Sequence, residues 1–196
     1  MSHNSIPAFI KEEYSEINKI IFNNLKVLKT TNLFNLGGKD IDIFINLEKI
    51  NNLIRINKFH EAVNEALVND GIYCCCAENI NQRNHRKKKD RSFIIKPLLL
   101  FIDFIYKRVI PKLPIINKLY FLVTRGYNRV MSQTEIIGRL ISCGFEIQKT
   151  FEHKGLTYII SKRVNKASFD MAPSYGPIFK MKRVGKDGKI ISVYKF

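Results

Sequence analysis

Residues 42–77 contain the pattern that most restricts the fold of this chain: an apolar run, an amphipathic segment, a turn signal and a second apolar run. The first run, residues 42–47, is long enough for a buried strand and too short for a helix. Residues 56–68 carry apolar side chains at helical spacing, and Asn69-Asp70-Gly71 is a strong stop signal for a helix. Residues 71–77 predict a second buried strand. Strand, helix and strand in this order form a βαβ unit, so we expect a parallel sheet covered by helices.

The segments on either side of this unit continue the alternation of helices and strands. Residues 9–24 predict an amphipathic helix, and residues 27–34 predict a short strand. Ser132-Gln133-Thr134-Glu135 has the form of a capping box and predicts a helix that ends near Ser142. Two further strands are expected around a turn at Lys154-Gly155. The sequence therefore predicts an α/β domain over residues 1–164.

The carboxyl-terminal part of the chain has a different pattern. Residues 165–177 contain two prolines and little apolar periodicity, which is typical of a linker. Residues 178–196 alternate apolar and polar side chains around Asp187-Gly188, which predicts a β-hairpin. Because a hairpin of this size is only marginally stable alone, we expect it to be the start of a larger unit that continues beyond this chain.

Charge is distributed unevenly along the chain, whose formal net charge is +16. Residues 1–81 hold 8 basic and 10 acidic residues (net −2), residues 82–130 hold 13 and 2 (net +11), and residues 131–196 hold 12 and 5 (net +7). A protein that binds DNA along its whole face would spread this charge more evenly. No RNP, zinc-finger or Gly-x-x-Gly signature is present either, so no nucleic-acid partner is expected.

The basic middle of the chain has the composition of a segment that lies on a membrane surface. Residues 83–91 hold six basic residues, and the apolar stretch 93–123 is interrupted by charges and three prolines. No window offers the roughly 20 uninterrupted apolar residues of a spanning helix. We expect an interfacial insertion at about residues 83–125 that meets anionic lipid. The alternative is an apolar helix packed on the domain's own sheet behind a solvated basic loop. The candidate membrane-surface residues are Arg86, Lys87, Lys88, Lys89 and Arg91.

Residues able to carry catalysis or bind a metal form no familiar pattern in this sequence. It has no glycine-rich phosphate loop, no nucleophile elbow and no CxxC pair. Cys74, Cys75, Cys76 and Cys143 are expected to be buried as small apolar residues in a reducing cytosol. His60 and His153 are expected at the surface, and the amino terminus does not resemble a signal peptide. The residues alone thus predict no catalytic residue and no metal site.

One stretch resembles a known enzyme fold. DIFINLEKINNLIRINKFHEAVNEALVNDGIYCCCAEN, together with the helix at residues 132–142 and Cys143-Gly144-Phe145-Glu146, resembles the later part of a class I methyltransferase domain. This resemblance implies a Rossmann-like sheet with a partial methyltransferase topology. The glycine-rich cofactor loop of that family falls in the first half of its fold, where this chain has no matching residues. S-adenosylmethionine is therefore not an expected cofactor.

A second stretch resembles a different family. YGPIFKMKRVGKDGK, running on to Val193-Tyr194-Lys195-Phe196, is similar to the opening of bacterial polyprenyl-phosphate sugar-1-phosphate transferases of the Bacteroidetes type. The resemblance implies a complete enzyme that uses a carboxylate nucleophile and Mg²⁺, with a catalytic Asp-Glu pair downstream of the segment present here. It implies that Arg183, Gly185 and Lys195 help to bind phosphate or substrate; charges that keep a strand edge soluble are the alternative. No catalytic residue and no cofactor are expected in this chain itself.

Two functional hypotheses follow from these resemblances. In the first, the chain is the amino-terminal portion of a sugar transferase that moves a sugar phosphate from a nucleotide sugar to polyprenyl phosphate in exopolysaccharide or capsule synthesis. In the second, it is a non-catalytic regulatory or binding module with a degenerate methyltransferase-like fold. In both, the expected location is cytoplasmic, peripheral on the inner face of the cell membrane, with an anionic membrane surface as a partner.

Overall fold

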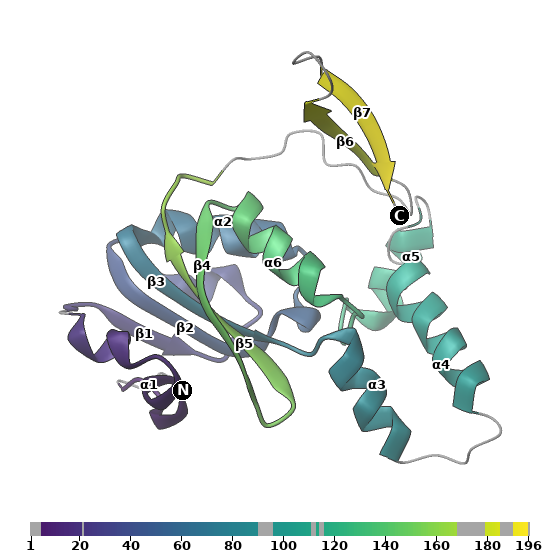
Figure 1. The fold of residues 1–196 in the computed structure, drawn as a ribbon, viewed down its shortest axis with the longest axis horizontal. Coiled ribbons are helices and arrows are strands. Elements are labelled where there is room, and N and C mark those ends of the chain that lie inside the picture. Colours follow the sequence, from purple (N-terminus) through teal and green to yellow (C-terminus); the bar gives the residue numbers. More distant parts are fainter. Residues whose placement is uncertain are drawn as a thin grey trace.

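A five-stranded sheet forms the centre of the molecule in the computed structural model, which describes residues 5–20, 22–89, 96–110, 113, 116–167, 179–184 and 190–195 (Figure 1). The strands lie in the order β1-β2-β3-β5-β4. Strands β1 to β3 are parallel, whereas β5 is antiparallel to β3 and β4 is antiparallel to β5. Their bounds are β1 Leu25–Leu28, β2 Ile41–Lys49, β3 Leu67–Ala77, β4 Phe145–His153 and β5 Leu156–Arg163. The predicted α/β class is confirmed.

The βαβ unit is present, with α2 (Ile56–Ala66) as the crossover between β2 and β3. The predicted helix stop at Asn69-Asp70-Gly71 was wrong, because α2 ends at Ala66 and these residues lie inside β3. There the pairing with β2 moves from Ile41↔Leu67 to Ile43↔Ile72, so β3 carries an irregularity. Asp70 has φ 63°, a left-handed conformation that glycine, asparagine and aspartate tolerate. A strand irregularity and a helix end use the same residue types, and the sequence pattern does not separate them.

The amino-terminal segment departs from the single helix predicted over residues 9–24. The structure has a short α1 (Ala8–Glu13) followed by a 3-10 helix, η1 (Ser15–Lys19). They are separated by Tyr14, whose φ of −131° and ψ of 78° are not helical. The strand expected at residues 27–34 is shorter, and a second 3-10 helix, η2 (Leu33–Leu36), follows it.

The predictions for residues 132–161 are confirmed. Helix α6 (Gln133–Ser142) begins after Ser132, whose hydroxyl oxygen accepts a hydrogen bond from the Glu135 N–H at 3.2 Å. The helix is followed by Gly144 at φ 87°, where a Cβ would lie only 2.3 Å from the carbonyl oxygen of Asn165. Glycine is required there on both counts. Strands β4 and β5 form the expected hairpin around Lys154-Gly155.

The sheet has a hydrophobic core on each face, as the period of two along a strand requires. Phe44, Tyr73 and Cys75 belong to the core that α2 and α6 cover. Cys74 and Cys76 belong to the opposite core, which α1 and η1 cover. All four cysteines are buried and free, in agreement with the prediction that they act as small apolar residues.

The segment between β3 and α6 forms a set of helices that we call the helical arm, residues 80–130. It contains α3 (Ile80–Lys89), α4 (Lys96–Phe104), a π-helical turn η4 (Ile105–Val109) and α5 (Ile116–Thr124). These helices extend past one end of the sheet instead of covering a face of it (Figure 1). The alternative of an apolar helix packed on the sheet therefore does not describe this arrangement.

The carboxyl-terminal hairpin is present as β6 (Phe179–Val184) and β7 (Ile190–Lys195), which pair antiparallel. Its expected Asp187-Gly188 turn lies outside the described residues, as does most of the linker expected at residues 165–177. The division of the chain into a domain, a linker and the start of a second domain stays a prediction.

Candidate functional site

The carboxyl ends of the parallel strands are the place where open α/β sheets bind their ligands. At the ends of β1 and β2, the buried side chain of Asn46 bonds to the backbone of Thr30. Its Oδ1 accepts from the Thr30 N–H at 3.1 Å, and its Nδ2 donates to the Thr30 carbonyl at 3.0 Å. These two bonds connect the segment that follows β1 with strand β2. The polar groups of Asn46 therefore stabilise the fold.

The ends of β2 and β3 are joined to the helical arm by Asn51, which lies in the short 3-10 helix η3 (Ile50–Asn52) and is 2% exposed. Its Nδ2 donates to the carbonyl oxygens of Glu78 at 2.9 Å and Arg129 at 2.8 Å, and its Oδ1 accepts from the Glu78 N–H at 2.8 Å. Asn79 forms a parallel bridge with Met131. The two ends of the arm therefore meet at the carboxyl ends of β2 and β3, which is where an open α/β sheet binds a ligand.

Ion pairs hold α3 against the sheet and against α4. The guanidinium of Arg83, which is 5% exposed, donates two hydrogen bonds to the Asp103 carboxylate, at 2.9 and 3.0 Å. The guanidinium of Arg86 donates to the Glu78 carboxylate at 2.7 and 3.1 Å. Burial by itself raises the pKa of Glu78. The hydrogen bond and the positive charge of Arg86, together with the charges of Lys49 and Arg83, have the larger combined effect and hold this pKa below its usual value. Glu78 thus remains charged at neutral pH.

These ion pairs bear on the candidate membrane-surface residues. Arg86 lies on α3, where its side chain is 58% exposed while its guanidinium bonds to Glu78. Lys87, Lys88 and Lys89 form the end of α3, and Arg91 lies outside the described residues. Sequence reasoning did not find Asn51, Glu78 or Asp103. The one signal for Asp103 was that it is the only acidic residue of residues 93–123.

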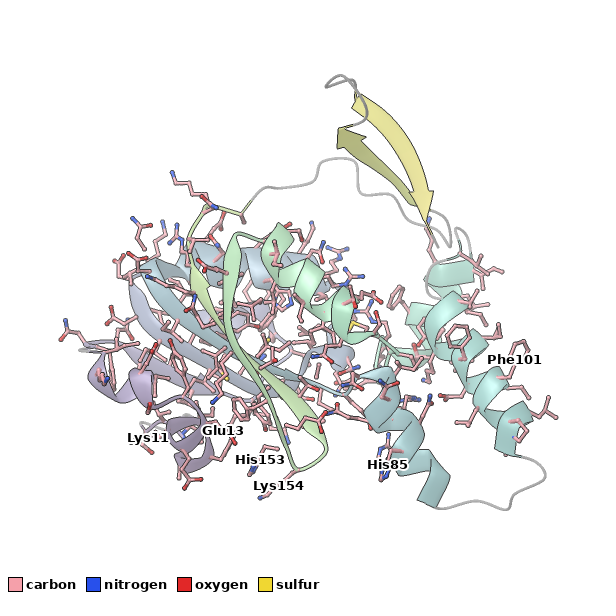
Figure 2. The ribbon with its side chains drawn as sticks, viewed as in Figure 1. Lys11, Glu13, His85, Phe101, His153 and Lys154 are labelled. Atoms are coloured by element: carbon pink, nitrogen blue, oxygen red, sulfur yellow. The ribbon has the colours of Figure 1, made fainter. Side chains whose placement is uncertain are left out.

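The outward sides of α4 and α5 are apolar. Six aliphatic and aromatic side chains on them have exposed fractions of 53–77%. These residues are Leu98, Phe101 and Ile102 on α4 and Leu119, Leu122 and Val123 on α5. Figure 2 shows Phe101 directed away from the rest of the arm. We call these six residues the apolar face of the arm.

The inward side of the arm is aromatic and well packed. The ring of Tyr120, which is buried, lies edge-on to that of Tyr106 with 5.5 Å between the ring centroids. The ammonium group of Lys107 lies over the Tyr106 ring at 5.0 Å from its centroid. The guanidinium of Arg129 lies 5.5 Å from the centroid of the Phe121 ring. These contacts fix which side of α5 is turned outward.

The buried titratable groups of the sheet domain have no catalytic arrangement. His60 is fully buried, with Nδ1 3.3 Å from the Tyr73 hydroxyl, so the prediction of a surface histidine was wrong. Burial, with a contribution from the charge of Arg139, lowers the pKa of His60 to about 3. Burial also raises the pKa of the Cys76 thiol to about 12. A neutral imidazole and protonated thiols, closed off from solvent, are core residues and not nucleophiles.

The residues expected to bind phosphate lie on the hairpin. Arg183 pairs with Ile191, and Lys195 pairs with Phe179, whereas Gly185 lies outside the described residues. Four steps along the ladder separate these two pairs, so their backbones are about 14 Å apart at about 3.4 Å per residue. The structure does not place Arg183 and Lys195 next to each other, and their role stays a prediction.

The described residues lack two further features. They contain no group of three or more His, Cys, Asp or Glu side chains that could hold a metal ion. In the same part of the chain, no helix is both long and apolar enough to cross a membrane.

No protein-family profile and no curated protein matches this sequence. Among solved structures, the chain is similar to a possible exported protein from Bordetella parapertussis (TM-score 0.41, 9% identity, covering 67% of this chain and 42% of that one). It is also similar to an O-methyltransferase family protein from Burkholderia thailandensis (TM-score 0.40, 14% identity, 69% and 34% covered). A third is the pyocyanin biosynthetic protein PhzM (TM-score 0.38, 14% identity, 67% and 33% covered). The chain spans less than half the length of these structures, and likenesses at such TM-scores assign neither a family nor a function.

Proposed function

We propose that this chain is the amino-terminal, non-catalytic portion of a bacterial sugar transferase. The complete enzyme would move a sugar phosphate from a nucleotide sugar to polyprenyl phosphate in exopolysaccharide or capsule synthesis, with Mg²⁺ and a carboxylate nucleophile supplied by a later part of the protein. The observation that carries this proposal is the resemblance of residues 175–196 to the opening of that family. The antiparallel pairing of β6 with β7 agrees with the hairpin that the resemblance implies.

Reading the gene past codon 196 is the first test of this proposal. We expect the reading frame to continue into Arg-Thr/Ser-Met and later into an Asp-Glu pair. The product of the whole reading frame should then transfer sugar phosphate from a nucleotide sugar to polyprenyl phosphate in a Mg²⁺-dependent assay, and residues 1–196 alone should not. A stop codon directly after Phe196, or an inactive full-length product, contradicts the proposal.

A stop codon there would favour the second candidate function, a regulatory or binding module with a degenerate methyltransferase-like fold. One observation favours it independently: the carboxyl ends of β2 and β3 are covered by Asn51 and by the returning end of the arm at Arg129. Isothermal titration with S-adenosylmethionine tests whether the chain binds this cofactor, which neither candidate function requires. We expect no heat of binding, because the side chains at these strand ends bond to the chain itself.

We further propose that the arm attaches the protein to an anionic membrane surface, peripherally and on the cytoplasmic side. The net charge of +11 on residues 82–130 supports this, since each basic residue near an anionic surface contributes about 1 kcal/mol. Flotation with vesicles of phosphatidylcholine and phosphatidylglycerol tests it.

A variant with Lys87, Lys88, Lys89 and Arg91 changed to glutamine, which keeps the ion pair of Arg86 with Glu78, should float less than the parent chain. Its matched control loses the same charge from exposed lysines outside the arm. These are Lys11, Lys19, Lys39 and Lys154. Equal flotation of the two variants, or no flotation of the parent, contradicts membrane attachment through the basic residues at positions 83–91, which we call the basic run.

A further inference from the structure

We infer that the apolar face of the arm enters the acyl-chain boundary of one leaflet, so that the protein is held by inserted side chains and not by charge alone. This inference rests on the proposed membrane attachment and specifies the depth and the residues of that contact. The occupant of the apolar face is thus the lipid of an anionic bilayer.

The first observation is the spacing of the exposed side chains. Leu98, Phe101 and Ile102 are three and four residues apart, as are Leu119, Leu122 and Val123, so each set lines one side of its helix. Single exposed apolar residues are ordinary on a protein surface. Two such stripes are not ordinary when α5 packs, through Tyr120 and Tyr106, on the helical turn η4 that directly continues α4. Large apolar patches mark interaction sites.

The second observation is that the helices cannot turn these stripes inward. Asp103 lies on the side of α4 that faces α3, where Arg83 binds it through two hydrogen bonds. Tyr120 is buried on the inner side of α5 and packs against Tyr106. Rotating either helix to bury its apolar stripe would expose Tyr120 or break the buried ion pair of Arg83.

The net charge of the arm indicates what kind of partner contacts its apolar face. The arm combines this face with a net charge of +11, while residues 1–81 have a net charge of −2. Lys118 and Arg125 are exposed on and directly after α5. Basic side chains beside an apolar helix face suit an anionic lipid surface, where they reach the headgroups.

Helices α4 and α5 have 9 residues each. At 1.5 Å per residue each is about 13 Å long, against a hydrocarbon core of about 30 Å, so the arm enters one leaflet.

The chain contains no tryptophan, so an introduced tryptophan is a clean reporter of this contact. We would prepare Phe101→Trp and Leu122→Trp, with Phe34→Trp as the control, since Phe34 is 92% exposed on η2, outside the arm. Each is mixed with phosphatidylcholine–phosphatidylglycerol vesicles that carry bromine on the acyl chains. The emission of the tryptophan introduced at position 101 or 122 should shift to the blue and fall by about half or more, while emission from position 34 should not change.

A second pair of variants tests the same contact without a reporter. Phe101→Glu combined with Leu122→Glu should reduce vesicle partitioning by about a hundredfold, since two inserted side chains are lost. Phe34→Glu should leave partitioning unchanged. Because all three residues are exposed, these variants are expected to fold, and circular dichroism checks that they do.

The possible outcomes distinguish failure of this inference from failure of the proposed membrane attachment. Flotation of the parent chain without quenching at positions 101 and 122 would overturn insertion and leave surface adsorption. No flotation at all would overturn the membrane proposal itself. A blue shift that grows with protein concentration in the absence of lipid would show that a second copy of the chain covers the apolar face, and would overturn the inference.

Discussion

His60 is held in the core as a neutral base between α2 and the sheet. Its Nδ1 lies 3.3 Å from the Tyr73 hydroxyl, and the positive charge of Arg139 lies close enough to oppose protonation. Burial is the larger cause of its low pKa, which is about 3. The unfolded chain, with a histidine pKa near 6.5, therefore binds a proton at mildly acidic pH that the folded chain does not bind.

This difference predicts how stability depends on pH. A histidine whose folded pKa is depressed contributes stability that is present above pH 6.5 and is lost as the pH falls toward 3. We expect the free energy of unfolding to fall by about 2 kcal/mol between about pH 8 and about pH 5 on account of His60. His60→Gln should flatten this part of the profile in urea unfolding. His153→Gln is the matched control, and an equal flattening there would contradict the assignment.

Asn51 acts at the scale of whole elements, because its three hydrogen bonds join η3, the end of β3 and the returning end of the arm. Replacing it with alanine leaves the Glu78 N–H and two carbonyl oxygens without these partners at a site that is 2% exposed. We expect Asn51→Ala to lower the free energy of unfolding by about 2–4 kcal/mol. Asn69→Ala, at an exposed position of β3, should change it by less than about 0.5 kcal/mol. Urea titration followed by circular dichroism compares the two, and similar values would contradict the role of Asn51.

The sequence predicts elements well where a local pattern decides them. The βαβ unit follows from apolar runs, and α6 follows from the capping box at Ser132, whose hydroxyl does cap the helix. Patterns that serve two structures were misread, as at Asp70, where residues typical of a helix end form an irregular strand instead. His60 was misplaced because its partner Tyr73 comes from another element, and helical periodicity does not show what packs against a polar residue.

The candidate site was predictable only in outline. Composition predicted an insertion at about residues 83–125 without a spanning helix, because charges and prolines are visible in the sequence itself. The membrane-surface role of this insertion stays a prediction. The ion pair of Arg83 with Asp103 joins residues 20 positions apart on different helices. It is this tertiary contact that sets which side of α4 faces outward, so the apolar face could not be defined before the fold was known.

At the scale of the whole molecule, the predicted division into domain, linker and hairpin implies that the hairpin contributes little to the stability of the domain. Among the residues whose burial the structure describes, both hydrophobic clusters are built from residues between Ile6 and Ile160. An isolated two-stranded hairpin is marginally stable in water. We therefore expect a chain that ends at residue 167 to keep its free energy of unfolding within about 0.5 kcal/mol of the parent value. A larger loss in urea unfolding would show that the hairpin packs on the domain, against the predicted division into domain, linker and hairpin.

The proposed membrane attachment, by charge and by inserted side chains together, predicts a particular dependence on salt. Raising the ionic strength from about 0.1 M to about 1 M shortens the Debye length from about 10 Å to about 3 Å, so the attraction of the +11 segment to anionic lipid is screened. The contribution of the apolar face is not screened. In flotation at low salt, the protein should prefer anionic over neutral vesicles.

At high salt that preference should disappear while partial binding to both kinds of vesicle remains. Phe101→Glu combined with Leu122→Glu should lose this remaining binding, whereas neutralising the basic run should leave it intact. Complete release of the parent chain by salt would mean that charge alone holds the molecule on the membrane. The six exposed side chains of α4 and α5 would then need another partner, which analytical ultracentrifugation of the lipid-free chain would reveal if that partner is a second copy.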